Sequence, residues 1–150
     1  MTLKSLTILT AMLLTSITPA LAQAVNSCDS YISDAAFLVF PPAETTAEYS
    51  EGSVRLITLD TGGDPACCSY HLMVLYPSVE GTYFECGLVS ASTDLGWYSI
   101  FVNQAKVLRD DAEGLSLIVP TEGNVEGEVI PSAVKIDVDL GANTLTVGTP

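Results

Sequence analysis

Apolar and polar residues alternate with period two along much of this chain, and no long stretch carries a helical period. The alternation is clearest near the C-terminus, where residues 134–140 read VKIDVDL. Successive side chains of a β-strand point to opposite faces, so the apolar residues of this segment share one face and its charged residues the other. The pattern predicts a strand with one buried and one wet face, as is common in antiparallel sheets.

The residues that follow predict a hairpin. Residues 141–144 read Gly-Ala-Asn-Thr, which offers turn chemistry, and Leu145 and Val147 then resume the apolar alternation. Placing Leu140 opposite Leu145 sets Val138 opposite Val147, so that both arms present apolar groups to one core.

Other strands are predicted from short β-branched and aromatic runs that Gly, Pro, Asp or Asn interrupt. Residues 45–51 and 103–109 stay open between a strand and a helical turn, because the second segment contains several good helix formers. Strands at this spacing predict an all-β fold, either an antiparallel β-sandwich or a small barrel, stabilised by disulfides and built from roughly seven or eight strands. The predicted strands cover residues 36–40, 54–59, 69–76, 82–90, 97–103, 115–119, 134–140 and 145–147. The predicted breaks cover residues 41–42, 62–65, 77–81, 110–114 and 122–127.

The first residues have the three parts of an export signal. Lys4 gives a positive start, residues 6–17 are apolar, and Ala20-Leu21-Ala22 offers a small-x-small cleavage site. We therefore expect residues 1–22 to be a cleaved signal peptide and residues 23–150 a single β domain in the periplasm or outside the cell. The mature chain has no apolar stretch long enough to predict a membrane span.

The net charge of the chain limits the kinds of partner that we expect. The chain has 18 Asp and Glu against five Lys and Arg, a formal net charge of −13. Such a surface repels phosphate backbones and anionic headgroups, so nucleic acid and membrane surfaces are not expected partners. A basic protein is an expected partner, and simple solubility is the alternative role for this charge.

Four cysteines, Cys28, Cys67, Cys68 and Cys86, predict two disulfides in an oxidising compartment. A bridge between the adjacent Cys67 and Cys68 ranks last, because it strains the peptide between them. We expect Cys28 to pair with one member of the Cys67-Cys68 pair and Cys86 with the other. A lipidated Cys28 is an alternative, since AVNSC is a loose lipobox match.

The stretch LITLDTGGDPACC, residues 56–68, places Asp60-Thr61-Gly62 after an apolar strand. The triplet resembles the active-site loop of retroviral-type aspartic proteases, which implies a dimer with two Asp60 carboxylates sharing one proton. A turn is the favoured interpretation. The Asp60 carboxylate can accept a backbone hydrogen bond two residues on, Gly62 and Gly63 allow positive φ, and Pro65 fixes the exit.

The single histidine, His71, alternates with Met73 and Leu75, and no nucleophile elbow accompanies it in the sequence. We expect it to be structural and predict no catalytic residue.

Predicted turns carry three acidic groups, for which solvated loops are favoured over a weak calcium site, so no metal ligand and no cofactor is predicted. They are Asp60/Asp64, Asp110/Asp111/Glu113 and Glu122/Glu126/Glu128.

Aromatic residues cluster in the middle of the chain, where core packing is favoured over an exposed patch that would bind a carbohydrate or a protein. The cluster comprises Tyr70, Tyr76, Tyr83, Trp97, Tyr98 and Phe101.

Together these features predict a non-enzymatic binding or interaction protein. A specific version is an inhibitor of a basic hydrolase such as lysozyme, since an acidic surface speeds association with a basic partner. The alternatives are a dimeric aspartic protease using Asp60 and an envelope structural subunit that pairs through an exposed strand edge.

Overall fold

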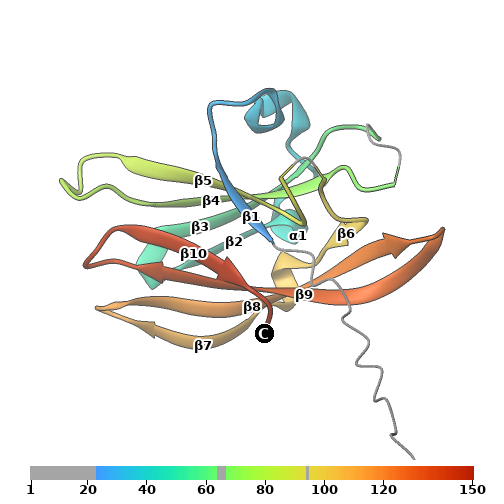
Figure 1. Cartoon of the computed structure of the whole chain (residues 1–150). Helices are drawn as coiled ribbons and strands as arrows, with labels where there is room; N and C mark the ends of the chain where they lie inside the picture. The colour runs from blue at the N-terminus through green and yellow to red at the C-terminus, as the bar shows by residue number, and fades with distance from the viewer. Residues whose placement is uncertain (1–22, 64–66, 94) are drawn as a thin grey trace, which may run out of the picture.

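The computed structural model describes residues 23–63, 67–93 and 95–150, so the predicted signal peptide lies outside the described residues. The described chain forms two antiparallel β-sheets, one above the other in Figure 1, with a disulfide between Cys28 and Cys86. The all-β prediction is confirmed. The predicted number of strands is wrong, because the described residues contain ten.

The first sheet contains five strands from the first two thirds of the chain, and each pairs antiparallel with its neighbours. Their order across the sheet is β1 (Ala24–Ser27), β5 (Phe84–Ser90), β4 (Tyr70–Pro77), β3 (Val54–Asp60) and β2 (Thr46–Tyr49).

The second sheet is built around one long hairpin, and two of its three other strands pair with the same strand of that hairpin. Its strands are β10 (Thr144–Gly148), β9 (Glu128–Asp139), β8 (Gly114–Val125) and β6 (Ser99–Ile100), with β7 (Lys106–Asp111) also on β8.

Within the part of the chain that the structure describes, helical structure is confined to single turns in the connections. These turns are η1 (Tyr31–Ser33), η2 (Ala35–Phe37), α1 (Pro42–Thr45), η3 (Ser50–Gly52) and η4 (Val102–Gln104).

The main core lies between the sheets because the apolar residues of facing strands alternate toward each other. On β3, for example, Val54 and Leu56 are fully buried while Arg55 and Ile57 are partly exposed. The core also contains Leu72, Val74, Val89, Leu115, Leu117, Val119, Val134, Ile136 and Val138.

The outer face of the first sheet is covered by the segment between β1 and α1, at the top of Figure 1. Leu38 of this segment forms a β-bridge with Leu59, which is fully buried. The predicted strand over residues 36–40 is wrong, because the Asp34 carboxylate accepts a hydrogen bond from the Ala36 N–H and begins the turn η2 instead.

The hairpin of β8 and β9 is longer than the sequence predicted. Its twelve-residue strands stay paired up to Val125 and Glu128, through most of the predicted break over residues 122–127. Glu126 and Gly127 alone make the turn, with φ of 53° and 90°. Positive φ at both central residues is the geometry of a tight two-residue hairpin turn, which keeps the twist of its strands.

The predicted register of the last hairpin is also wrong. Val138 lies opposite Leu145 rather than Val147, because the loop begins one residue earlier than expected. Asp139 starts it by accepting hydrogen bonds from the N–H groups of Gly141 and Ala142, at 2.9 and 2.7 Å. The shift moves the pairing by an even number of residues, so the apolar alternation survives.

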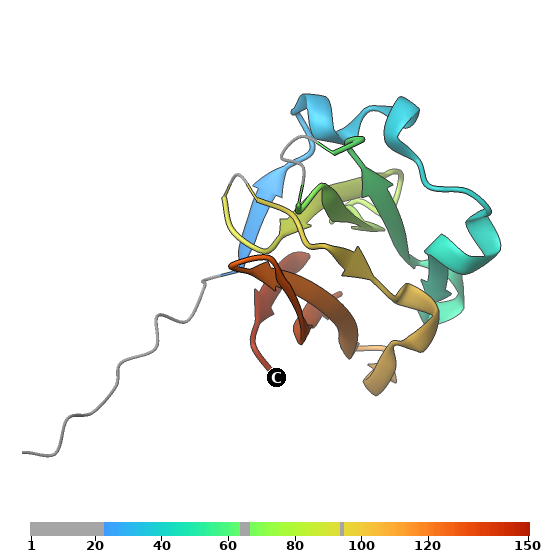
Figure 2. The same cartoon turned by 90° about the vertical axis from the view of Figure 1, so that its right-hand side faces the viewer.

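The predicted strand over residues 97–103 is instead the crossing between the two sheets (Figure 2). Trp97 exchanges backbone hydrogen bonds with Tyr70 of the first sheet, whereas Ser99 and Ile100 pair with β8 of the second. The chain then turns in η4 and runs out as β7.

Both ambiguous segments prove to be strands preceded by a helical turn. In the segment 45–51, α1 ends where β2 begins, and in 103–109, η4 ends just before β7. All residues of β7 are exposed, so no buried face imposes an alternation that would mark it as a strand.

The disulfide pairing corrects the sequence prediction. Cys28 pairs with Cys86, and Cys67 pairs with Cys68. Strand register explains the first bridge, because Ser27 lies opposite Gly87 and the next residues are therefore opposed across β1 and β5, with a Cα–Cα distance of 5.8 Å. Cys86 lies opposite Leu75 of β4. Cys68 is seven residues before Leu75 in the chain, which is about 23 Å of extended strand. Cys86 and Cys68 are therefore too far apart to form a disulfide.

One stretch of β9 lies beyond the reach of β10, which pairs only from Lys135 onward. There the Ala133 carbonyl accepts a hydrogen bond of 3.0 Å from Gln23 Nε2. Pro131, two residues before it, directs its backbone toward the same side and carries no N–H. Over the described residues, no helix has the length and apolar character to cross a membrane.

Candidate functional site

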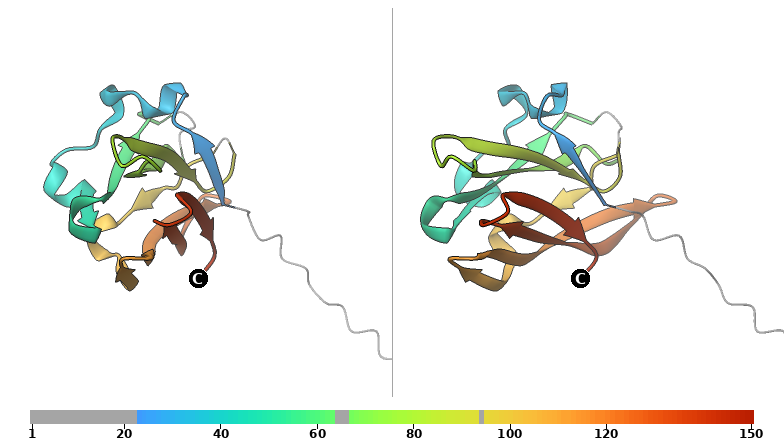
Figure 3. Two further views of the ribbon diagram at one scale, coloured as in Figure 1. Left: turned by 90° about the vertical axis from the view of Figure 1, so that its left-hand side faces the viewer. Right: turned by 60° about the vertical axis from the view of Figure 1, so that its left-hand side comes forward.

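Four hairpin turns gather at one end of the molecule, at the left of Figure 1 and facing the viewer in the left panel of Figure 3. They join β2 to β3, β4 to β5, β7 to β8 and β9 to β10. Each carries exposed carboxylates, and we name this surface the acidic turn end. It comprises Glu51, Glu80, Asp110, Asp111, Glu113 and Asp139.

A side-chain clamp joins the two sheets here. The Asp110 carboxylate accepts hydrogen bonds from the Ser50 hydroxyl and backbone N–H, at 2.7 and 3.2 Å. Ser50 and Glu51 both have positive φ, 50° and 56°, which is costly for residues with a side chain and is compensated by these contacts. Burial and then the nearby Asp110 charge raise the pKa of the Tyr49 phenol.

Two hollows adjoin at this end and share Glu51. The first, of about 410 Å³, lies between the turn at Ser50 and the residues from Asp110 to Ala112, with Leu140 beside them. The second, of about 290 Å³, lies between residues 51–53 and the loop of β4 and β5. Tyr83 borders the second hollow and is 57% exposed. An acidic surface with aromatic edges is therefore open to a partner.

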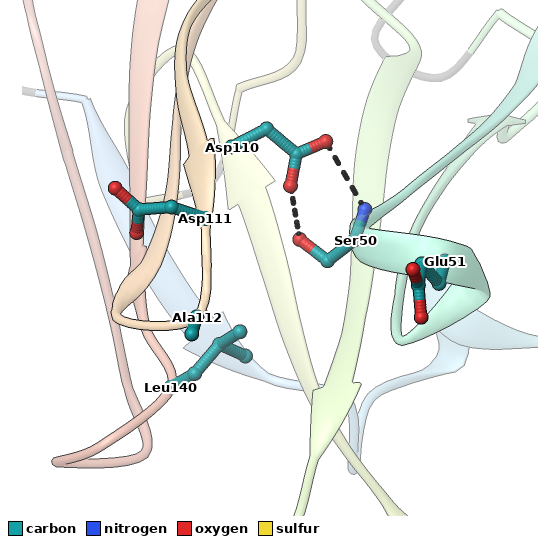
Figure 4. A pocket seen from close by; sticks show the side chains of 6 residues that line it. All are labelled: Ser50, Glu51, Asp110, Asp111, Ala112 and Leu140. Carbon is teal, nitrogen blue, oxygen red and sulfur yellow. Dashed lines mark hydrogen bonds between the residues drawn. The ribbon is translucent and has the colours of Figure 1, made fainter.

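The carboxylates of the first hollow diverge. Figure 4 shows the Asp110 carboxylate directed at Ser50, while those of Asp111 and Glu51 point away from it. Among the described residues, no group of three or more His, Cys, Asp or Glu side chains converges for a metal ion. Spread charges of one sign suit a broad basic surface better than a single cation.

Three of the four described cations are engaged in ion pairs within the protein. Arg55 Nε lies 3.2 Å from Glu48 and its guanidinium stacks 5.0 Å from the Phe84 ring centroid. Lys135 lies 2.8 Å from Asp137, and Arg109 3.9 Å from Glu113. Few positive charges are therefore left to offset the acidic turn end.

Asp60 does what the turn interpretation predicted. Its Oδ1 accepts hydrogen bonds from the Gly62 N–H at 2.9 Å and the Ser69 hydroxyl at 2.6 Å, and Gly62 and Gly63 have φ of 79° and 90°. The carboxylate is therefore held by its own loop. Asp64 and Pro65 of the same motif lie outside the described residues.

His71 lies on the outer face of the first sheet and is 2% exposed. Its Nδ1 is 2.8 Å from the hydroxyl of Ser90, which is buried as well. Burial lowers the pKa of the imidazole, and the charge of Asp60 opposes this only in part. The ring is hydrogen-bonded within the protein, as expected of a structural histidine.

Acid should therefore selectively weaken the wild-type protein through His71. The pKa of His71 in the folded protein lies below its unfolded value of about 6.5. Above pH 6.5 the ring is neutral in both states, and its contribution to stability is complete. As the pH falls from 6.5 through the folded-state pKa, the unfolded chain binds the proton first and this contribution is lost. We expect the free-energy difference between wild type and His71→Gln to shrink below pH 6.5, by up to about 1.4 kcal/mol per pH unit. Urea unfolding at a series of pH values measures this, and a constant difference would contradict it.

The aromatic cluster divides between core and surface. Trp97 is buried and Tyr76 packs against the core, whereas Tyr83 and Tyr98 are exposed. The core interpretation is correct for the first pair and wrong for the second.

Comparisons with protein families, with curated proteins and with solved structures find no match for this chain.

Sequence reasoning found Asp110, Asp111 and Glu113 as an acidic group but missed their meeting with Ser50 and Glu51. The two segments are 60 residues apart, and their contact depends on the stacking of two sheets. The available signal was the polar Ser-Glu-Gly run, which predicts only a turn.

Proposed function

We propose that this protein is an exported, non-enzymatic binding domain that uses its acidic turn end to dock onto a basic protein. The observation that carries the proposal is the gathering of exposed carboxylates from four separate turns around two adjoining hollows. Loops held at one end of a β scaffold are a common place for binding surfaces, since the scaffold fixes their positions.

We further propose that the scaffold is a β-sandwich. The support is a single apolar core supplied by the facing strands of both sheets. Such packing leaves the turns at the ends free to vary without loss of the core.

Binding is favoured over catalysis by the state of the two residues with catalytic potential. Asp60 is hydrogen-bonded within its own turn, and His71 is buried against Ser90. The specific version that charge supports best is inhibition of a basic hydrolase such as lysozyme, because opposite charges speed association.

Export rests on residues 1–22, whose pattern is that of a cleaved signal peptide. The cysteine pairs fit a periplasmic or extracellular location, where such bridges persist.

Neutralising the acidic turn end should slow association with a basic partner. We expect Glu51→Gln/Asp111→Asn to reduce the association rate with a purified basic lysozyme about threefold to tenfold at low salt. Physiological salt, about 0.15 M, should remove most of the difference between the variant and the wild type. The Asn side chain keeps an oxygen for the N–H groups of Glu113 and Gly114 that Asp111 now binds. Surface plasmon resonance at several salt concentrations measures the rates.

The matched control is Glu126→Gln/Glu128→Gln, which removes the same charge from the β8–β9 turn, at the opposite end of the molecule in Figure 1. Glu126, like Glu51, has positive φ, so both variants touch similar backbone. Equal slowing by both variants would show that net charge alone acts and would reject the acidic turn end. Loss of lysozyme activity on binding would identify inhibition.

A further inference from the structure

A third hollow, of about 260 Å³, lies at the seam where the chain crosses from the first sheet to the second. Thr58 and Tyr70 contribute from the first sheet, and Val39 and Thr45 close one side. The crossing contributes residues 99–101, 103 and 104. We name it the seam pocket. It is distinct from the acidic turn end, since Thr58 is five residues along β3 from Ser53, or about 17 Å of strand.

Thr58 is the unusual residue of the seam pocket. It occupies an inward position in the alternation of β3, after Val54 and Leu56, and is 1% exposed. Its hydroxyl oxygen is buried and has no hydrogen-bond partner among the described residues. A buried hydroxyl without a partner is costly, and native structures seldom keep one without a reason.

Thr58 borders the hollow, so a ligand can supply the missing partner. A change of χ1 rotamer redirects the threonine hydroxyl without moving the backbone.

The wall of the seam pocket combines polar and apolar side chains and is largely uncharged. Ser99 contributes a hydroxyl, and Asn103 and Gln104 contribute amides that can both donate and accept hydrogen bonds. Phe101 adds an apolar ring face. Burial and then the charge of Asp60 raise the pKa of Tyr70, whose phenol is hydrogen-bonded to the Asp60 carboxylate.

The charge of the pocket selects among polar ligands. Of the described residues that line it, Glu44 carries the one formal charge, and it is negative. A phosphorylated or carboxylated ligand would meet repulsion there and no cation to pair with. A neutral ligand that carries hydroxyl groups around an apolar ring face meets no such repulsion. Its hydroxyl groups match the hydroxyl and amide groups of the pocket, and its apolar face matches the Phe101 ring. The volume lies just below the roughly 300–1,000 Å³ usual for drug-sized ligands, which leaves room for one ring.

We propose that the seam pocket binds one ring of a neutral carbohydrate, with Thr58 as a hydrogen-bonding group on its floor. This site is independent of the acidic turn end, and either can fail without the other.

The test uses the purified mature chain, isotope-labelled for NMR, and a panel of glucose, galactose, mannose, N-acetylglucosamine and their disaccharides. At least one neutral sugar should shift the amide signals of Thr58, Ser99 and Asn103 in a saturable manner. Glucose 6-phosphate should leave them unchanged. No saturable shift with any sugar of the panel, or equal binding of the phosphate, would overturn the proposal.

Two threonine variants identify the floor of the pocket. Thr58→Val should weaken the sugar that binds at least about tenfold, which corresponds to the loss of one well-placed hydrogen bond. Thr121→Val is the matched control, because the Thr121 hydroxyl is also buried and unpartnered among the described residues but does not line the pocket. It should bind as wild type, and equal weakening by both variants would reject the site.

Asn103→Ala provides a second variant if Thr58→Val does not fold. Asn103 is exposed, so its replacement should leave the fold intact while weakening the same sugar. Unchanged affinity in Asn103→Ala would contradict the assignment of the wall.

Discussion

Replacing Cys28 and Cys86 together by alanine should lower the free energy of unfolding by about 4 kcal/mol. The bridge joins residues 58 positions apart, and in the chain-entropy model a loop of that length restricts the unfolded chain by about this amount. It also fixes the edge strand β1 to β5, which otherwise depends on four residue pairs. Both cysteines are partly exposed, so the substitution leaves only a small packing defect.

The chain offers a matched control in its second bridge. Cys67→Ala/Cys68→Ala removes a bridge between adjacent residues, which closes almost no loop, and should cost about 1 kcal/mol. Urea unfolding followed by the fluorescence of Trp97 measures both variants. Equal losses would show that the long loop is not the source of stability.

The second large effect is expected at Gly96, where an alanine should cost about 3 kcal/mol or more. A Cβ at this position would overlap the backbone carbonyl of Tyr70 and lie 2.8 Å from that of Cys68. The Gly96 N–H also donates to the Cys68 carbonyl at 2.9 Å, so the two segments cannot separate without losing this bond. Because the contacts are to backbone, no side chain can move aside.

Gly123→Ala tests whether this cost is local. Gly123 lies in β8, and a Cβ added there would meet nothing within 4 Å, so alanine should change stability by less than about 0.5 kcal/mol. Thermal unfolding followed by circular dichroism compares the two variants. A mild effect at Gly96 would mean that the crossing segment adjusts easily.

Strands with one buried face are predicted well by the sequence. The alternation of β3, β4 and β9 follows from their burial between the sheets, and the sequence carries it directly. A polar residue at an inward position, Thr58, is visible in the same pattern, although the pattern does not show its role.

Strands without a buried face escape such prediction. The exposed strand β7 contains helix formers and is held by its pairing with β8, a tertiary contact that local preference does not show. The polar residues around Glu126 predict a loop, although two residues complete that turn.

The site itself depends on distant contacts. The meeting of Ser50 with Asp110 requires both sheets to be in place. The pairing of Cys28 with Cys86 likewise follows from strand register, which the number and spacing of cysteines leave open.

Pro131 has a consequence for the behaviour of the protein at high concentration. An unpaired edge strand can pair with the edge strand of another copy of the protein, and repeated pairing of this kind leads to fibrils. On this edge of β9, Pro131 has no N–H to donate to a second strand. The Ala133 carbonyl, two residues further on, already accepts a hydrogen bond from Gln23. This edge of the longest hairpin is thereby protected against pairing with another copy of the chain.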